Sequence, residues 1–314
     1  KAGLCQAALG TDTGGSIRQP AALCDVVGLK PTYGRVSRHG IIAYASSFDQ
    51  VGPITTSIED AALIMEVIAG KDDYDSTASS TTVPPYSKQL QSSGKRKIGF
   101  LTDCLNADGL DPEIRDGVWD QINKWKAAGH AVEPVDFPYL DFLVPAYYVL
   151  TTAEASSNLA RYDGIHYGHR SKDNTSLDDT YKQSRTEGFG TEVKRRIMLG
   201  TFVLSSGYFD AYYSKAQKIR RIIQEETDKI LKEYDFILMP TTPRTAPVIG
   251  QNMDDPIAMY LEDIFTVQAN LTGLPAISLP VGMHSNGLPF GIQLIGNKFE
   301  EASLLAFSKE ILNN

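Results

Sequence analysis

Short apolar runs that alternate with segments of helical periodicity are the feature of this sequence that most restricts its fold. Residues 98–101 form one such run, and Val132, Val135 and Phe137 suggest another strand. Between them, residues 112–128 repeat apolar side chains at the spacing of one helical face, at Ile114, Val118, Ile122 and Trp125. The order strand, helix, strand is typical of an α/β sheet with crossover helices.

The alternation continues to the C-terminal end of the sequence. Apolar runs cut off by Pro240 and Pro280, together with the alternating residues 290–295, predict three more strands. An amphipathic helix is predicted over about residues 208–233, and a final helix near 300–312. The apolar face of the first of these helices would consist of Phe209, Tyr212, Ala216, Ile219, Ile223 and Ile230.

A further helix is predicted after Ser57, because a serine cap followed three residues later by an acid, here Asp60, marks a helix start. Residues 72–96 then turn to serine, threonine, aspartate, proline and lysine with almost no apolar periodicity. We expect them to form a surface connection and not a domain boundary.

Composition narrows the class of protein. With 314 residues, 42% hydrophobic and 22% charged, the chain can bury a sizeable core. The net charge of −8 argues against a global attraction to nucleic acid or to an anionic membrane. The three cysteines are far apart and lack the paired spacing of a zinc site or a disulfide framework. No apolar run approaches the roughly 20 residues that cross a bilayer. We expect a soluble protein of a reducing, cytoplasmic or organellar compartment.

One glycine-rich loop carries candidate chemistry. Residues 10–20, GTDTGGSIRQP, place two glycines directly before Ser16. Glycines let several backbone N–H groups converge on one point, which can bind a phosphate or stabilise the oxyanion of an acyl-transfer intermediate. A phosphate loop fits less well, because no lysine follows the glycines. On residue type alone, a plain turn capped by Ser16 stays open.

Residues 10–20, continued by Ala21, Ala22 and by residues 27–35 (VGLKPTYGR), closely resemble the second half of the amidase signature. The resemblance implies an α/β fold with a mixed central sheet covered by helices on both faces. It identifies Ser16 as the nucleophile and the backbone N–H groups of Thr13, Gly14 and Gly15 as the oxyanion hole. It leaves the five histidines without a catalytic role. Asp12 and Arg18 flank the nucleophile, and we assign them support roles that keep the loop rigid.

The proton relay of the family is absent from this chain. Family members use a lysine and a second serine with a cis peptide bond, both upstream of the nucleophile motif, and neither position exists here. The sequence also opens without an initiator methionine. We therefore expect residues 1–314 to be the C-terminal two-thirds of a single amidase-signature domain. If the relay were truly missing, a non-catalytic scaffold would be the alternative.

Three longer stretches, residues 146–164, 184–213 and 270–280, resemble one branch of the family, the A subunits of glutamyl-tRNA(Gln) amidotransferases. The resemblance implies that glutamine is hydrolysed at Ser16 to supply ammonia. A glutamine site needs a cation and an anion for a zwitterion. Arg196, Asp263 and Tyr147 match the glutamine-binding positions, although on residue type alone they would be two surface charges and a core tyrosine.

The same resemblance implies partners. Subunits B and C would complete a heterotrimer, and one of these partners would use ATP and Mg to convert Glu-tRNA(Gln) to Gln-tRNA(Gln). No cofactor is expected on this chain, and tRNA would be contacted mainly through the partner. The runner-up function is a stand-alone amidase that acts on another small amide.

Overall fold

A computed structural model describes residues 1–92, 94–173, 175–250 and 262–313. The chain forms two compact units, a subdivision that the sequence did not indicate. One, the sheet unit, comprises Lys1–Gly40, Gln50–Val144 and Arg221–Asn314. The other, the helical unit, comprises Ile41–Asp49 and Pro145–Arg220. Each unit is therefore described by itself.

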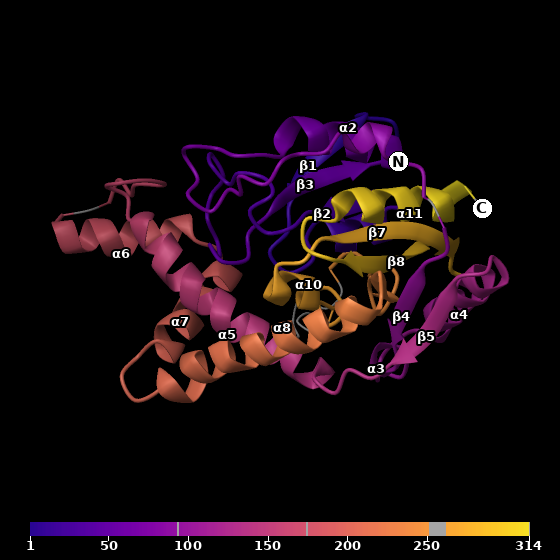
Figure 1. Cartoon of the computed structure of the whole chain (residues 1–314). Helices are drawn as coiled ribbons and strands as arrows, with labels where there is room; N and C mark the ends of the chain where they lie inside the picture. The colour runs from indigo at the N-terminus through magenta and orange to yellow at the C-terminus, as the bar shows by residue number, and fades with distance from the viewer. Residues whose placement is uncertain (93, 174, 251–261, 314) are drawn as a thin grey trace. The chain divides into compact units, whose positions relative to one another are not determined.

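The sheet unit is built on an eight-stranded sheet in the order β1-β3-β2-β7-β8-β6-β4-β5 (Figure 1). β4 is parallel to β5 and β6, and the other neighbours are antiparallel. The mixed α/β fold that the resemblance implied is confirmed. The strands are β1 Ala7–Thr11, β2 Val27–Lys30, β3 Val51–Thr55, β4 Lys97–Leu101, β5 Ala131–Val135, β6 Phe236–Pro240, β7 Ala276–Met283 and β8 Pro289–Gly296.

The five strands from β4 to β8 were predicted, whereas β1, β2 and β3 were not. Their apolar runs are short and are interrupted by glycine or proline, as in VGLK and VGPIT. Such residues weaken a strand pattern. The tertiary pairing of β1 and β2 with β3 stabilises them instead.

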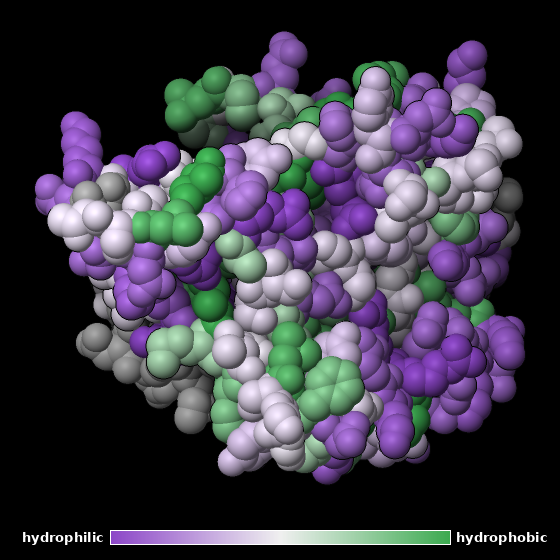
Figure 2. All heavy atoms as spheres, turned by 90° about the vertical axis from the view of Figure 1, so that its left-hand side faces the viewer, coloured by the Kyte–Doolittle hydropathy of each residue, from purple (hydrophilic) through white to green (hydrophobic). Residues whose placement is uncertain are grey.

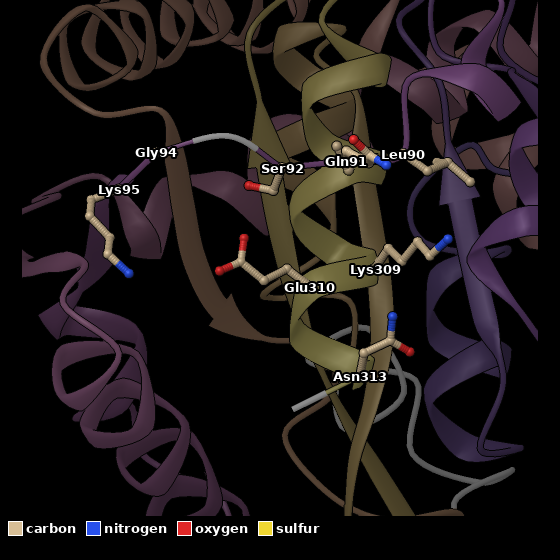
Figure 3. Close-up of a pocket in the computed structure, with 9 residues that line it drawn as sticks. Leu90, Gln91, Ser92, Gly94, Lys95, Lys309, Glu310 and Asn313 are labelled. Carbon is tan, nitrogen blue, oxygen red and sulfur yellow. The ribbon is translucent and has the colours of Figure 1, made fainter.

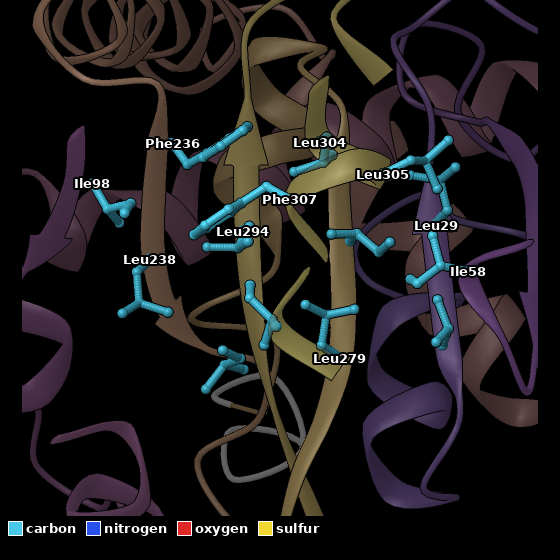
Figure 4. Packing of buried hydrophobic residues seen from close by; sticks show 14 of the residues in the cluster. Leu29, Ile58, Ile98, Phe236, Leu238, Leu279, Leu294, Leu304, Leu305 and Phe307 are labelled. Carbon is cyan, nitrogen blue, oxygen red and sulfur yellow. The ribbon is translucent and has the colours of Figure 1, made fainter. Parts of the chain in front are cut away.

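Strand register gives the sheet two different faces. Leu29, Ile277 and Leu294 lie opposite one another across β2, β7 and β8, and all three are fully buried. Helices α2 (Ile58–Ile68), α4 (Pro112–Ala127) and α11 (Glu301–Asn313) pack on this face. Figure 4 shows leucine, isoleucine and phenylalanine side chains from strands and helices meeting there. We call it the apolar face.

The helices of the apolar face agree with their sequence signals. Ser57 caps α2 by accepting a hydrogen bond from the Asp60 amide at 3.1 Å. In α4 the predicted stripe is buried at every position, and α11 lies where the final helix was expected. The described residues between α2 and β4 include the short η1 (Tyr86–Lys88), in which Tyr86 is fully buried.

The opposite face, which we call the polar face, carries the side chains that alternate with these residues. Gly28, Ser278 and Gln293 lie opposite one another on it. Helix α1 (Arg18–Leu23) packs against β2, β7 and β8. The approach is close, because a Cβ atom on Gly28 would lie 2.6 Å from the Ala21 Cβ atom. The short helices α3 (Thr102–Leu105) and α10 (Val267–Thr272) also belong to this unit.

The helical unit contains most of α5 (Leu140–Asn158) and the start of α8 (Lys215–Glu233), with η2 (Leu159–Arg161), α6 (Leu177–Gly188) and α7 (Thr191–Val203) between them. The prediction of one amphipathic helix over about residues 208–233 is wrong in its first part. Asp210–Ser214 form a π-helix, η3, and the Phe209 and Tyr212 side chains are exposed. Their rings pack instead on neighbouring rings, those of Tyr213 and Phe202.

No described helix has both the length and the apolar character that crossing a membrane requires. Figure 2 shows hydrophobic residues at several separate places among hydrophilic ones.

Candidate active site

Ser16 lies on the loop between β1 and α1, and its side chain is exposed. The residues around it are not: Asp12, Gly14, Gly15 and Arg18 are all buried. The loop therefore presents one hydroxyl group from a backbone that is packed on both sides of it.

The Asp12 carboxylate organises this backbone. It accepts hydrogen bonds from the amides of Gly15 at 2.8 Å and Ile17 at 3.2 Å, which lie on either side of Ser16. It also accepts from Arg18 Nε at 3.1 Å and from Asn270 Nδ2 at 2.9 Å. Burial by itself would raise the pKa of Asp12, but Arg18, Lys30 and Asn270 outweigh it and hold that pKa below its usual value. Asp12 is thus an ionised centre for the loop.

Arg18 connects the loop to the polar face of the sheet. Its guanidinium is fully buried and donates to the Thr266 carbonyl at 2.9 Å, Asn270 Oδ1 at 2.7 Å and Gln293 Oε1 at 2.8 Å. Sequence reasoning did not identify Asn270 or Gln293. A signal existed for Gln293, because it is a polar residue inside the otherwise apolar strand β8.

Gly15 can only be glycine. Its φ is +137°, which L side chains rarely adopt, and a Cβ atom would lie 2.4 Å from Thr266 Oγ1. Thr266 Oγ1 donates to the Gly14 carbonyl at 2.6 Å. The Gly15 amide is directed at Asp12 at 2.8 Å, and this hydrogen bond competes with a place in an oxyanion hole. The oxyanion role of Thr13, Gly14 and Gly15 stays a prediction.

Lys30, the last residue of β2, supports the loop, a role that the sequence did not indicate. Its fully buried amine donates to Gln50 Oε1 at 3.0 Å, to the Pro31 carbonyl at 3.0 Å and to the Leu274 carbonyl. Gln50 in turn accepts the Asp12 amide at 2.8 Å through its carbonyl. Burial, together with the nearby Arg18 charge, lowers the pKa of Lys30 to about 7.

Asp263 is linked to the same loop through Thr266. The Asp263 carbonyl accepts the Thr266 amide at 3.0 Å and Thr266 Oγ1 at 3.1 Å, and that hydroxyl also reaches Gly14. Two hydrogen bonds, through Thr266, thus connect Asp263 to the loop that carries Ser16, although Asp263 lies 247 positions after Ser16 in the sequence.

Arg196 and Tyr147 belong to the helical unit. Arg196 Nε donates to Glu192 Oε1 at 2.8 Å, and Nη1 donates to the Tyr44 hydroxyl at 3.0 Å. Burial would lower the pKa of Arg196, but Tyr44 and Glu192 outweigh it and the pKa is raised. Tyr147 is 4% exposed, with its ring edge-on to those of Phe48 and Tyr148.

Two cavities of about 510 Å³ each lie beside α11, away from these residues. One is lined mostly by polar side chains, with Glu310 projecting from α11 (Figure 3). The other is lined by Trp125, Phe307 and their neighbours. Neither of these two cavities includes a predicted site residue.

The glycine-rich loop with its exposed Ser16 lies beside a mixed sheet, which is the fold that the resemblance to the amidase signature implied. Residues 2–305 match the family described as Amidase, and the chain belongs to that family.

Individual relatives show which members of the family this chain is similar to. The A subunit of glutamyl-tRNA(Gln) amidotransferase from Brevibacillus brevis is 54% identical over 298 residues, which are 95% of this chain and 61% of that protein. The crystal structure of the corresponding A subunit from Thermotoga maritima matches with a TM-score of 0.82 and 42% identity, over 100% of this chain and 63% of that one. The structure of the peptide amidase of Stenotrophomonas maltophilia matches with a TM-score of 0.75 and 30% identity, over 99% of this chain and 63% of that one. The chain therefore spans under two thirds of the length of these relatives.

Proposed function

We propose that this chain carries the nucleophile of a glutaminase, the A subunit of a glutamyl-tRNA(Gln) amidotransferase. The observation that supports it most is the exposed Ser16 hydroxyl on a loop held by the buried Asp12–Arg18 pair. A rigid loop keeps the attacking oxygen and the surrounding amides in place during acyl transfer. The names of the relatives point to the same reaction.

In this proposal Ser16 attacks the side-chain amide of glutamine and forms an acyl-enzyme, ammonia leaves, and water releases glutamate. The proton of Ser16 must pass to a base, which the family resemblance assigns to a lysine and a second serine upstream of the nucleophile motif. Arg196 would bind the α-carboxylate of glutamine, Asp263 the α-ammonium group, and Tyr147 would orient the substrate.

The ammonia would then pass to the partner subunits B and C, one of which would use ATP and Mg to convert Glu-tRNA(Gln) to Gln-tRNA(Gln). The resemblance in residues 146–164, 184–213 and 270–280 implies this assignment, and the relatives are named as A subunits of a glutamyl-tRNA(Gln) amidotransferase.

The test is Ser16→Ala in the full-length protein assembled with its partner subunits. Glutamine-dependent amidation of Glu-tRNA(Gln) should be lost, because no acyl-enzyme can form, while amidation from added ammonia should continue. Ser206→Ala, which removes another exposed serine hydroxyl, is the matched control. Glutamine hydrolysis near the wild-type rate in Ser16→Ala would exclude the nucleophile assignment.

A stand-alone amidase is the second candidate, favoured by the 30% identity to a peptide amidase. It would need the Ser16 loop but not Arg196 or Asp263. Gel filtration of the full-length protein alone, followed by ammonia release from a panel of amides, separates the two. Activity of the isolated protein on neutral amides, with none on glutamine, would favour the stand-alone enzyme.

A further inference from the structure

We propose that Tyr44 is a positioning residue that orients the Arg196 guanidinium and so makes the site selective for amides that carry a carboxylate. This inference rests on the proposed function, because it needs Arg196 to bind the substrate carboxylate. It adds a residue from a segment, Ile41–Asp49, that none of the sequence motifs indicated.

The guanidinium of Arg196 is restrained both by hydrogen bonds and by aromatic rings. Nη1 donates to the Tyr44 hydroxyl at 3.0 Å, and Nε donates to Glu192 Oε1 at 2.8 Å. The central carbon of the guanidinium lies 5.7 Å from the Tyr44 ring centroid and 5.5 Å from that of Tyr148. A planar fork of donors recognises a carboxylate only at a defined angle, so both kinds of restraint bear on binding.

Tyr44 is itself held in place by backbone contacts. Its amide donates to Asp49 Oδ2 at 2.8 Å, and its carbonyl accepts Asn158 Nδ2 at 3.1 Å. Asp49 also accepts the Ala45 amide at 2.9 Å. The phenol is therefore presented from a short segment whose position is fixed by α5, not from a free loop.

The protonation of Tyr44 explains why a phenol is useful beside Glu192. Burial raises the pKa of Tyr44, despite the opposing effect of Arg196, so the hydroxyl stays neutral at physiological pH. A second carboxylate in its place would compensate the Arg196 charge and repel an anionic substrate. A neutral acceptor restrains the guanidinium while leaving its positive charge for the substrate.

The experiment compares two substrates in the full-length protein assembled with its partners. Ammonia release is measured from glutamine and from glutamine methyl ester, which lacks the α-carboxylate. In Tyr44→Phe, which keeps the ring and removes the acceptor, the KM for glutamine should rise about tenfold. Its kcat, and the KM for the ester, should change less than about twofold. Tyr162→Phe, in the same unit and with its ring packed on that of Tyr167, is the matched control.

A second measurement tests whether Tyr44 acts through Arg196. In an Arg196→Ala background, adding Tyr44→Phe should raise the KM for glutamine by less than about twofold, because the group it positions is gone. An equal rise in KM for glutamine and for the ester would mean that Tyr44 has a merely structural role and would overturn the proposal. A full tenfold rise in the KM for glutamine in the Arg196→Ala background would overturn it as well. Wild-type enzyme that releases ammonia from the ester but not from glutamine would instead overturn the proposed function, and this inference with it.

Discussion

The two faces of the central sheet bury side chains of opposite character. On the apolar face, Leu29, Ile277 and Leu294 pack with α2, α4 and α11 in one cluster of hydrophobic side chains. One residue along each strand, the polar face carries Gly28, Ser278 and Gln293, and above them the buried Asp12 and Arg18. The same strands thus serve both a hydrophobic core and a charged network.

The apolar face contributes mainly to the stability of the fold, whereas the polar face fixes the geometry of the loop that carries Ser16. Apolar contacts are non-directional and contribute roughly in proportion to the area buried. A buried ion pair can contribute little net stability because of its desolvation cost, yet removing one partner is costly, so such a pair holds one arrangement of the loop. We therefore expect substitutions on the apolar face to change stability alone, and those on the polar face to change stability and activity together.

The largest effect is expected for Arg18→Met on the polar face. Removing the guanidinium leaves the Asp12 carboxylate buried without its main partner, which should lower the free energy of unfolding by about 3 to 5 kcal/mol. Glutamine hydrolysis by the remaining folded protein should also be lost.

Denaturant unfolding and an ammonia assay check this prediction. Arg221→Met, at an arginine whose side chain is 72% exposed, should stay within about 0.5 kcal/mol of the wild type. A loss below about 1 kcal/mol in Arg18→Met would show that the polar face tolerates an unpaired Asp12.

The next effect is expected for Leu294→Ala on the apolar face. The side chain is fully buried between β7 and β6, so its loss should leave a cavity and cost about 2 to 5 kcal/mol. Activity per folded molecule should remain at the wild-type level. Leu177→Ala, at a leucine that is 61% exposed, is the control. If the activity per folded molecule of Leu294→Ala fell together with its stability, the two faces would not differ in the way proposed.

The smallest effect, counted per pH unit, concerns the pH dependence contributed by Lys30. Its pKa is about 7 in the folded protein, below the usual 10.5. Between these two values the unfolded chain holds a proton that the folded chain releases, so the free energy of unfolding should rise with pH. The slope is at most about 1.4 kcal/mol per pH unit. Unfolding curves at several pH values above 7 should show this rise in the wild type and a flatter profile in Lys30→Met; equal slopes would contradict it.

Much of the apolar face was predictable, because its signals are local. The stripe of α4 and the cap of α2 at Ser57 lie within single helices, and both were found where the sequence placed them. The π-helix at Asp210–Ser214 was not predictable in this way, because its aromatic residues follow the same spacing as a buried helix face.

The sequence by itself determined the fold class, the family and the loop that carries Ser16, because helical periodicity, strand alternation and a glycine-rich motif are properties of neighbouring residues. Only the tertiary structure decided which groups hold that loop. Arg18 meets Asn270 and Gln293 across 252 and 275 positions of sequence. Within the helical unit, the tertiary structure likewise decided that Tyr44 meets Arg196 across 152 positions. No local pattern specifies such pairs, since a buried donor finds its acceptor only once distant strands and helices have packed together.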